Sequence, residues 1–270
     1  LTAETVSMNG QTGDGITITN STATVNINGG TVGNSDDPGG NAVEVNGSNG
    51  NVTIAAALTK TTAGKIVLVT NRTGNTVAFS GNISATNAVD NGIDVNTNTA
   101  GIVNFLGTTK TLTTGAGTGV NLATNGTGVI NFTGGGLVIN TTGGVGFNAT
   151  GGAGAVTVQG TGNTINATTG PANTNTNTAL NVSSTTIGAL GLTFQAIHSG
   201  NNTAAADPAN GIVLNTTGNL GGLTVTGTGT TDGSGGTIRS TTSSGVRLVS
   251  SNSLSLSNIN LIGNGTAQTV

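Results

Sequence analysis

The feature that most constrains this chain is a three-residue pattern, in which one residue of any type separates two apolar residues. This pattern recurs nine times. The copies begin 27, 23, 27, 27, 25, 35, 32 and 34 residues apart. A repeat of this length indicates a solenoid, in which each coil buries its apolar face by stacking on its neighbours. The nine pairs are Ile16/Ile18, Val43/Val45, Ile66/Leu68, Ile93/Val95, Val120/Leu122, Val145/Phe147, Leu180/Val182, Ile212/Leu214 and Val246/Leu248.

The composition favours an all-β fold over disorder. The chain has 48 Gly among 270 residues, but its net charge is only −3 and Val, Ile and Thr are plentiful. Disordered chains usually combine a high net charge with few β-branched residues. The absence of Cys excludes a disulfide framework and a thiolate metal site.

One coil can be followed from residue 120 as VNLATN, GTGVINFTG and GGLVINTTG. Alternation with a period of two predicts three short strands, with Val120 and Leu122 inside and Asn121 outside. Gly and Asn suit the corners because they tolerate left-handed backbone conformations. We therefore predict a right-handed parallel β-helix (β-solenoid) with three short strands per coil and about nine coils, since parallel crossovers are right-handed by default.

The second and third strands of each coil are predicted from the same alternation. The inward pairs of the second strand are Val25/Ile27, Val52/Ile54, Val77/Phe79, Val103/Phe105, Ile130/Phe132, Val156/Val158, Leu192/Phe194, Leu223/Val225 and Leu254/Leu256. The third, weaker strand lies near Val32, Leu58, Ile83, Leu112, Val138, Ile165, Ile197, Ile238 and Leu261.

Three phenylalanines occupy the same inward position in successive coils. Phe79, Phe105 and Phe132 each close the second strand of their coil. Phe is a residue type that is usually buried. We therefore predict an internal aromatic ladder rather than an exposed carbohydrate platform.

The repeat runs without a break in composition, so we expect a single β-solenoid domain over residues 1–270. Loop insertions are expected near 34–40, 170–178, 198–210 and 227–236, where Gly, Asn, Asp and Pro gather. Insertions of this kind project from one corner of a solenoid and often carry its binding function.

The carboxylates give no catalytic constellation. Glu44 and Asp94 share the outward position of the first strand, but the pattern places them two coils and about 10 Å apart with Val67 between them. His198, Ser199 and Asp207 lie close in sequence without a supporting motif, whereas a triad is defined by geometry. We therefore expect no catalytic residues, no cofactor and no enzymatic activity.

One turn offers a calcium candidate. Asn34, Asp36 and Asp37 lie in the segment NSDDPGG, where two carboxylates and backbone carbonyls can surround a hard cation. The same Asp-Pro-Gly segment also makes a good turn without any ion.

Charge and hydropathy limit the kinds of partner that this chain can bind. The six Lys and Arg residues do not cluster, which argues against nucleic acid, and no apolar run approaches the ~18 residues of a membrane span. Asn and Thr at the corners are expected to form hydrogen-bonded ladders between coils.

Neither end of the repeat shows a capping helix or a run of charges. Val6 and Met8 at one end, and Ile259 and Leu261 at the other, are predicted to belong to third strands. A bare terminal coil presents unpaired backbone and an open core. The chain is therefore expected to be either a window of a longer solenoid or a subunit that stacks end to end with copies of itself.

Several segments resemble known proteins in pattern and composition, among them DNGIDVNTNT, GVNLATNGTGVINFTGGG and SLSLSNINLIGNG. They resemble the β-strand repeats of bacterial surface and secreted proteins, including right-handed β-helices of the adhesin and autotransporter-passenger kind. The resemblance implies an extracellular or cell-surface location and a structural or adhesive role.

The sequence thus favours an extracellular structural protein, either a fibre subunit associating with itself head to tail or laterally, or the stalk of a larger surface protein. Two alternatives remain open. One is an adhesin that binds a glycan or a cell surface through its corner loops, and the other is a polysaccharide lyase or hydrolase.

Overall fold

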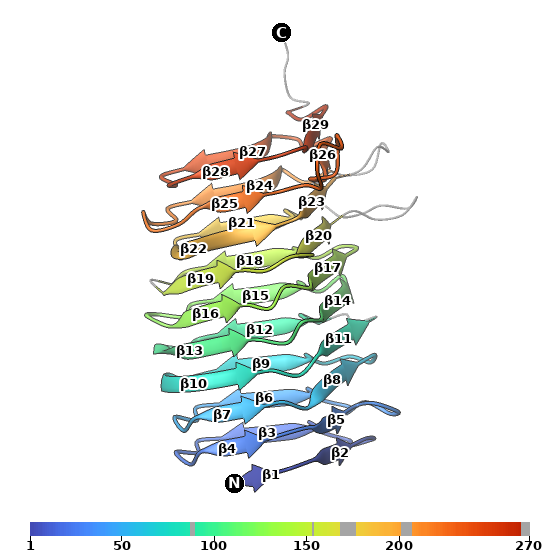
Figure 1. Cartoon of the computed structure of the whole chain (residues 1–270), viewed down its shortest axis with the longest axis vertical. Helices are drawn as coiled ribbons and strands as arrows, with labels where there is room; N and C mark the ends of the chain where they lie inside the picture. The colour runs from blue at the N-terminus through green and yellow to red at the C-terminus, as the bar shows by residue number, and fades with distance from the viewer. Residues whose placement is uncertain (87–89, 153, 168–176, 201–206, 266–270) are drawn as a thin grey trace.

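The computed structural model describes residues 1–86, 90–152, 154–167, 177–200 and 207–265, and every regular element in them is a strand. The strands form three parallel sheets that stack coil upon coil along one axis (Figure 1). The predicted all-β parallel solenoid, with three strands per coil and about nine coils, is confirmed. At about 4.8 Å per coil the stack is roughly 45 Å long.

Each sheet takes one strand from every coil. Sheet A contains β1 (Thr2–Ala3), β4 (Val25–Ile27), β7 (Val52–Ile54), β10 (Thr73–Phe79), β13 (Ala100–Phe105), β16 (Val129–Phe132), β19 (Ala155–Val158), β22 (Thr186–Phe194), β25 (Leu223–Val225) and β28 (Leu254–Leu256). Sheet B contains β2 (Val6–Met8), β5 (Gly30–Val32), β8 (Ala57–Lys60), β11 (Ile83–Thr86), β14 (Lys110–Gly115), β17 (Leu137–Thr141), β20 (Thr164–Ala167), β23 (Ala196–Ser199), β26 (Thr237–Arg239) and β29 (Asn260–Ile262). Sheet C contains β3 (Ile16–Thr19), β6 (Val43–Asn46), β9 (Val67–Thr70), β12 (Ile93–Asn96), β15 (Val120–Ala123), β18 (Phe147–Thr150), β21 (Leu180–Ser183), β24 (Asn210–Asn215) and β27 (Ser244–Val249).

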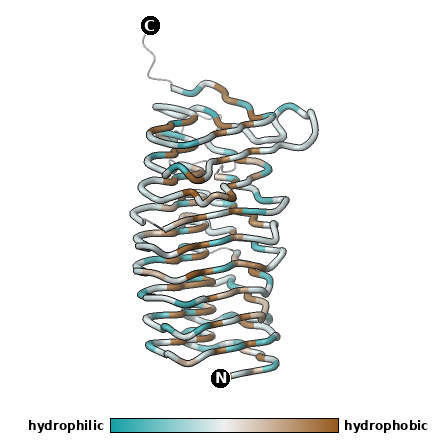
Figure 2. The backbone as a smooth tube through the Cα atoms, turned by 60° about the vertical axis from the view of Figure 1, so that its left-hand side comes forward, coloured by the Kyte–Doolittle hydropathy of each residue, from teal (hydrophilic) through white to brown (hydrophobic). Residues whose placement is uncertain are grey.

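The core fills the space between the three sheets. In Figure 2 the hydrophobic segments recur at the same places in successive coils. The predicted second strands all lie in sheet A, and their apolar pairs are buried from Val25 to Val225. Leu254 and Leu256, in the last coil, are only partly buried.

One predicted register is wrong by one residue. In the third coil, Val67 and Val69 pair with Val43 and Val45, so the inward pair is not Ile66/Leu68. Leu68 faces outward, although Ile66 is also buried, just before the strand. The error arises in a continuous apolar run, where a period of two has no polar residue to mark its phase.

A second register is wrong by two residues. Phe147 and Ala149 continue the inward positions of Val120 and Leu122, so the predicted pair Val145/Phe147 is displaced. The small side chain of Ala149 gives only a weak apolar signal at its inward position. The larger Val145 fits the apolar pattern better, although it does not occupy that position. With these corrections the first five coil spacings become 27, 24, 26, 27 and 27 residues.

The aromatic ladder is longer than predicted. The rings of Phe79 and Phe105 stack at 5.2 Å between centroids, and those of Phe105 and Phe132 stack at 4.6 Å. Phe147 from sheet C meets Phe132 edge to face at 5.9 Å and Phe194 at 6.0 Å. All five phenylalanines of the chain therefore form one continuous row through the core.

The two ends differ in exposure. At the N-terminal end, Ile16 and Ile18 of β3 are only 7% and 8% exposed. At the C-terminal end, Leu248 is 48% exposed and Leu261 is 53% exposed. Each end presents the edge strands of all three sheets. These strands are β1, β2 and β3 at the N-terminal end and β27, β28 and β29 at the C-terminal end.

Candidate functional site

The outward face of sheet C gathers more of the chain's polar chemistry than its other described faces. One column of side chains crosses its nine strands in register: Thr17, Glu44, Leu68, Asp94, Asn121, Asn148, Asn181, Val213 and Arg247. Glu44 and Asp94 therefore share this column two coils apart, as predicted. Leu68 lies between them, and not Val67, because of the register correction in β9.

Asp94 is surrounded by donors and is only 4% exposed. The side-chain amides of Asn91, Asn96 and Asn121 donate to its carboxylate at 3.1, 2.7 and 3.0 Å. The ammonium of Lys65 in the preceding coil lies 3.8 Å from Oδ2. The carboxylate thus ties together three consecutive coils.

Glu44 has the same local arrangement. Asn41 and Asn46 donate side-chain hydrogen bonds to its two oxygens at 3.0 and 3.1 Å. The shared pattern is an Asn three residues before the carboxylate and another two residues after it, in NAVEVN and NGIDVN. This pattern is visible in the sequence but was overlooked there, as was Lys65.

An asparagine ladder extends from Asp94 toward the C-terminal end. Asn148 donates to Asn121 at 2.9 Å, and Asn181 donates to Asn148 at 2.8 Å. All of these N–H groups point toward Asp94, so each amide polarises the next and the carboxylate accepts from the last one. Ladders between coils were predicted at corners, and this one lies on a strand face.

Sheet A carries a shorter ladder of the same kind. Asn131 donates to Asn104 at 2.9 Å, and the hydroxyl of Thr157 donates to Asn131 at 2.8 Å. The amide and hydroxyl groups of these two ladders therefore bond groups of the neighbouring coil.

A polar column also lies inside the corner that follows sheet C. Its members come two residues after each strand and are all buried: Ser48, Arg72, Asn98, Asn125, Gly152, Thr185 and Thr217. Asn98 donates to Asn125 at 2.8 Å, and Asn125 donates to the carbonyl of Val95 at 2.9 Å. Ser48, Asn98 and Asn125 thereby donate to strand carbonyls of the preceding coil, inside the solenoid.

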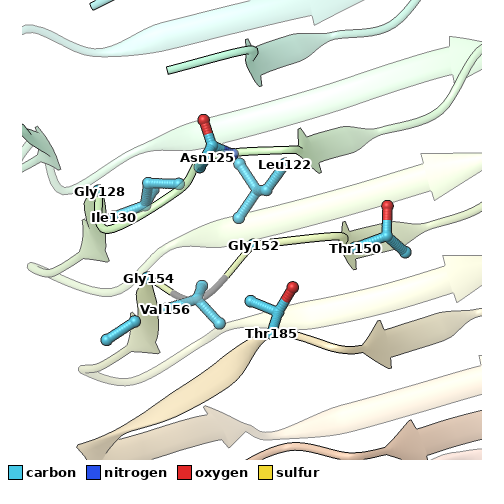
Figure 3. Close-up of a pocket in the computed structure, with 10 residues that line it drawn as sticks. Leu122, Asn125, Gly128, Ile130, Thr150, Gly152, Gly154, Val156 and Thr185 are labelled. Carbon is cyan, nitrogen blue, oxygen red and sulfur yellow. The ribbon is translucent and has the colours of Figure 1, made fainter. Parts of the chain in front are cut away.

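The column is interrupted at Gly152, where a cavity of about 10 Å³ opens between Asn125 and Thr185 (Figure 3). Leu122, Ile130 and Val156 also border it. This volume is close to that of one water-sized sphere. The cavity therefore has room for a water molecule and not for an organic ligand.

Two cations are buried at corners without a carboxylate partner among the described residues. Arg72 donates to the carbonyls of Ser48, Gly50 and Gly74, and burial lowers its pKa. Lys110 donates to the carbonyls of Gly107, Thr133 and Gly135, and burial lowers its pKa to about 8. Both serve as multiple donors to corner backbone.

The calcium candidate lies in the corner between sheets B and C. Asp37 accepts hydrogen bonds from the backbone and hydroxyl groups of Thr61 and Thr62, and from Lys60 at 3.0 Å. Burial alone would raise the pKa of Asp37, but these hydrogen bonds outweigh it and hold the pKa well below its usual range. Asn34 and Asp36 are exposed. Asp37 is thus already engaged by protein donors, and calcium binding stays a prediction.

The histidine region brings no triad together among the described residues. His198 faces outward in β23 and accepts a hydrogen bond from the Thr237 amide at 3.3 Å. Its pKa is lowered by burial and by nearby Arg239. Ser199 is buried on the opposite side of the strand, and burial raises the pKa of Asp207. Residues 201–206, between them, lie outside the described part.

The predicted loops are described only in part. The 34–40 and 227–236 insertions are described, whereas 170–176 of the second loop and 201–206 of the third lie outside the described residues. In the 227–236 loop, the Ser234 hydroxyl donates to the Thr231 carbonyl at 2.6 Å and accepts from the Thr228 amide at 2.9 Å. This loop is a compact turn held by its own hydrogen bonds.

Comparison with known proteins gives no match: no family model fits the chain, and no curated protein or solved structure resembles it significantly. Within the described residues, no three His, Asp or Glu side chains lie together as metal ligands. The same residues contain no helix long and apolar enough to cross a membrane.

Proposed function

We propose that this chain is an extracellular structural protein, a stiff β-solenoid rod that serves as a stalk or as a fibre element. The observation that carries the proposal is how the charged and amide groups are used. Asp37, Asp94, Lys60 and Lys110 each bond groups in a neighbouring coil, and the outward ladders do the same.

The geometry of the sheets supports a mechanical role. Hydrogen bonds between parallel strands run across the strands, and in a solenoid this direction is the long axis of the rod. Bending the rod therefore has to stretch bonds in a whole sheet at once. The side-chain ladders on sheets A and C add further bonds in the same direction.

The edge strands at the two ends of the sheets also support the structural role. Within the described residues, the first and last strands of each sheet pair with a neighbour on one side only, so further coils or another molecule can continue the sheets without a change of architecture. A rod of this kind provides length and stiffness, and this role requires no catalytic group.

The proposal is tested by electron microscopy of the purified chain, by surface labelling of the cells that produce it, and by assay against a panel of polysaccharides. We expect rods of uniform width, labelling of intact cells by antibodies to the folded chain, and no release of sugar ends. Cleavage of a polysaccharide that is lost in Glu44→Gln or Asp94→Asn would contradict the structural role in favour of an enzyme.

A further inference from the structure

We propose that the cavity beside Gly152 is a binding site for one ordered water molecule, which replaces a missing side chain in the polar column inside the corner that follows sheet C. The site consists of a donor on Asn125, an acceptor on Leu122 and the hydroxyl of Thr185, all of which line the cavity. It is independent of the proposed structural function, because it involves only groups inside the solenoid.

The side-chain amide of Asn125 has one N–H group to spare. Asn98, in the preceding coil, donates one N–H to the carbonyl of Val69 at 3.2 Å and the other to Oδ1 of Asn125 at 2.8 Å. Asn125 donates to the carbonyl of Val95 at 2.9 Å, which is the equivalent of the Val69 carbonyl. Its second N–H is therefore directed to the following coil, where Gly152 has no side chain. This N–H has no acceptor among the described residues, and Asn125 is only 5% exposed.

The carbonyl of Leu122 is the matching acceptor. Four side chains that come two residues after a sheet C strand donate to a carbonyl of the coil before. These pairs are Ser48 to Ile18, Asn98 to Val69, Asn125 to Val95 and Ser251 to Leu214, at 3.0, 3.2, 2.9 and 2.9 Å. Leu122 follows Val95 in the same register, and the residue placed to serve its carbonyl is Gly152. A carbonyl oxygen has two lone pairs, so it can accept such a donor in addition to a strand hydrogen bond.

Thr185 borders the site on its other side. It takes the column position after Gly152 and is only 8% exposed. Its hydroxyl donates to the carbonyl of Ser183 at 3.3 Å, so the hydroxyl oxygen can still accept a hydrogen bond. In Figure 3 this oxygen is directed toward the coil of Gly152, whereas the oxygen of Asn125 points away from that coil.

These three groups define the chemistry of the ligand. The ligand has to accept from the Asn125 N–H and donate to the Leu122 carbonyl, and it can donate a second bond to Thr185. A metal cation cannot accept a hydrogen bond, and a cavity of about 10 Å³ is too small for an organic molecule. Water both accepts and donates, and about three hydrogen bonds are typical of a buried water. This water continues the polar column from Asn125 to Thr185.

The test is a crystal structure of the full chain together with rotating-frame Overhauser spectra in solution. We expect one peak of electron density about 3 Å from both Nδ2 of Asn125 and the carbonyl oxygen of Leu122. We also expect a cross-peak between water and the Asn125 side-chain amide, with the sign of a dipolar contact. An empty cavity, or a peak that lacks these two contacts, would overturn the proposal.

Two substitutions of Gly152 displace the water in different ways. Gly152→Ser adds a hydroxyl that can donate to Leu122, whereas Gly152→Ala adds only a methyl group. A Cβ at this position lies 3.1 Å from the backbone nitrogen of Asn125, so both variants require the same small adjustment. Both should lose the water cross-peak, because the cavity has room for one water only. Gly152→Ser should unfold about 2–4 °C above Gly152→Ala, since it alone replaces a hydrogen bond of the water.

Gly13→Ser is the matched control, because Gly13 is exposed and has no atom near its Cβ position. This variant should keep the cross-peak between water and Asn125. A cross-peak that persists in Gly152→Ser, or equal unfolding temperatures of Gly152→Ser and Gly152→Ala, would contradict the proposed site.

Discussion

The ammonium of Lys60 donates to the carboxylate of Asp37 at 3.0 Å, and the two side chains are 0% and 6% exposed. Lys60 also donates to the carbonyl of Pro38 and the hydroxyl of Thr62, both at 2.6 Å. The pair joins the 34–40 loop to the next coil and buries an ammonium in the corner between sheets B and C.

Asp37→Asn is expected to lower the free energy of unfolding by about 3 kcal/mol, because it leaves the Lys60 ammonium buried without its counter-charge. Urea denaturation at pH 7 measures this change. Asp36→Asn is the control, since Asp36 is the exposed neighbour and its replacement should cost less than about 0.5 kcal/mol. Equal effects of the two substitutions would contradict the assigned role of the pair.

The lowered pKa of the Asp37 carboxyl predicts how the free energy of unfolding changes in acid. Because the folded state lowers the pKa of Asp37, its contribution is complete above the unfolded pKa of about 3.9 and is lost as the pH falls toward the folded value. Denaturation curves between pH 7 and pH 2 should therefore show a loss of stability below about pH 4 that is smaller in Asp37→Asn.

Lys110 predicts a further rise of stability with pH, in the alkaline range. Burial lowers its folded pKa to about 8 from 10.5, so above pH 8 the folded state binds fewer protons than the unfolded state. Stability from this group should rise between pH 8 and about pH 10.5, by up to about 3 kcal/mol at 1.36 kcal/mol per unit of pKa. Lys110→Met should remove this rise, and denaturation at pH 7 and pH 10 in both proteins measures it. The same slope in both proteins would assign it to other groups.

Alternation of apolar residues was enough to predict the fold. It placed the pairs of sheet A correctly, because Val25/Ile27 and most of its equivalents are separated by Asn, Thr or Ser, which mark the phase. It was wrong at Ile66/Leu68, where consecutive apolar residues carry no phase, and at Ala149, where a buried residue is small. Only pairing to the neighbouring coils decides such positions.

The polar chemistry was less predictable. Glu44 and Asp94 were placed in one column, but Lys65, Asn91 and Asn121 were not connected with Asp94. Two of these contacts join residues 27 and 29 positions apart, and the third depends on a flanking asparagine, so they emerge only when the coils are in register. Buried Arg72 and Lys110 were also missed, since a charged residue in a Gly-rich stretch is ordinarily read as exposed.

The asparagine ladder predicts coupling between coils. Asn148→Ala removes a donor from Asn121 and an acceptor from Asn181, so it should lower the free energy of unfolding by about 1–2 kcal/mol. Asn219→Ala, at an exposed position without a side-chain ladder partner among the described residues, should be nearly neutral. A double-mutant cycle of Asn148 and Asn181 should show a coupling energy, and strict additivity would contradict the ladder.

The aromatic row predicts sensitivity at its centre. Phe105 stacks on both Phe79 and Phe132, so Phe105→Ala should cost about 4 kcal/mol from lost burial and the cavity left behind. Phe105→Leu keeps most of the volume and should cost about 1–2 kcal/mol, which reflects mainly the lost ring contacts. Thermal unfolding of the two variants separates the contributions. A Phe105→Leu variant as stable as the parent chain would mean that stacking adds nothing measurable beyond volume.

Asp94 and Glu44 provide an internal comparison, because the same flanking asparagines hold both. Asp94 accepts from three amides and lies beside Lys65, whereas Glu44 accepts from two amides. Asp94→Asn replaces one acceptor oxygen with a donor facing other donors, so it should cost about 2–3 kcal/mol. Glu44→Gln has fewer bonds to lose and should cost about 1 kcal/mol. Urea denaturation of both variants tests this order. If Glu44→Gln were the more destabilising, the number of hydrogen bonds at each carboxylate would not account for its contribution to stability.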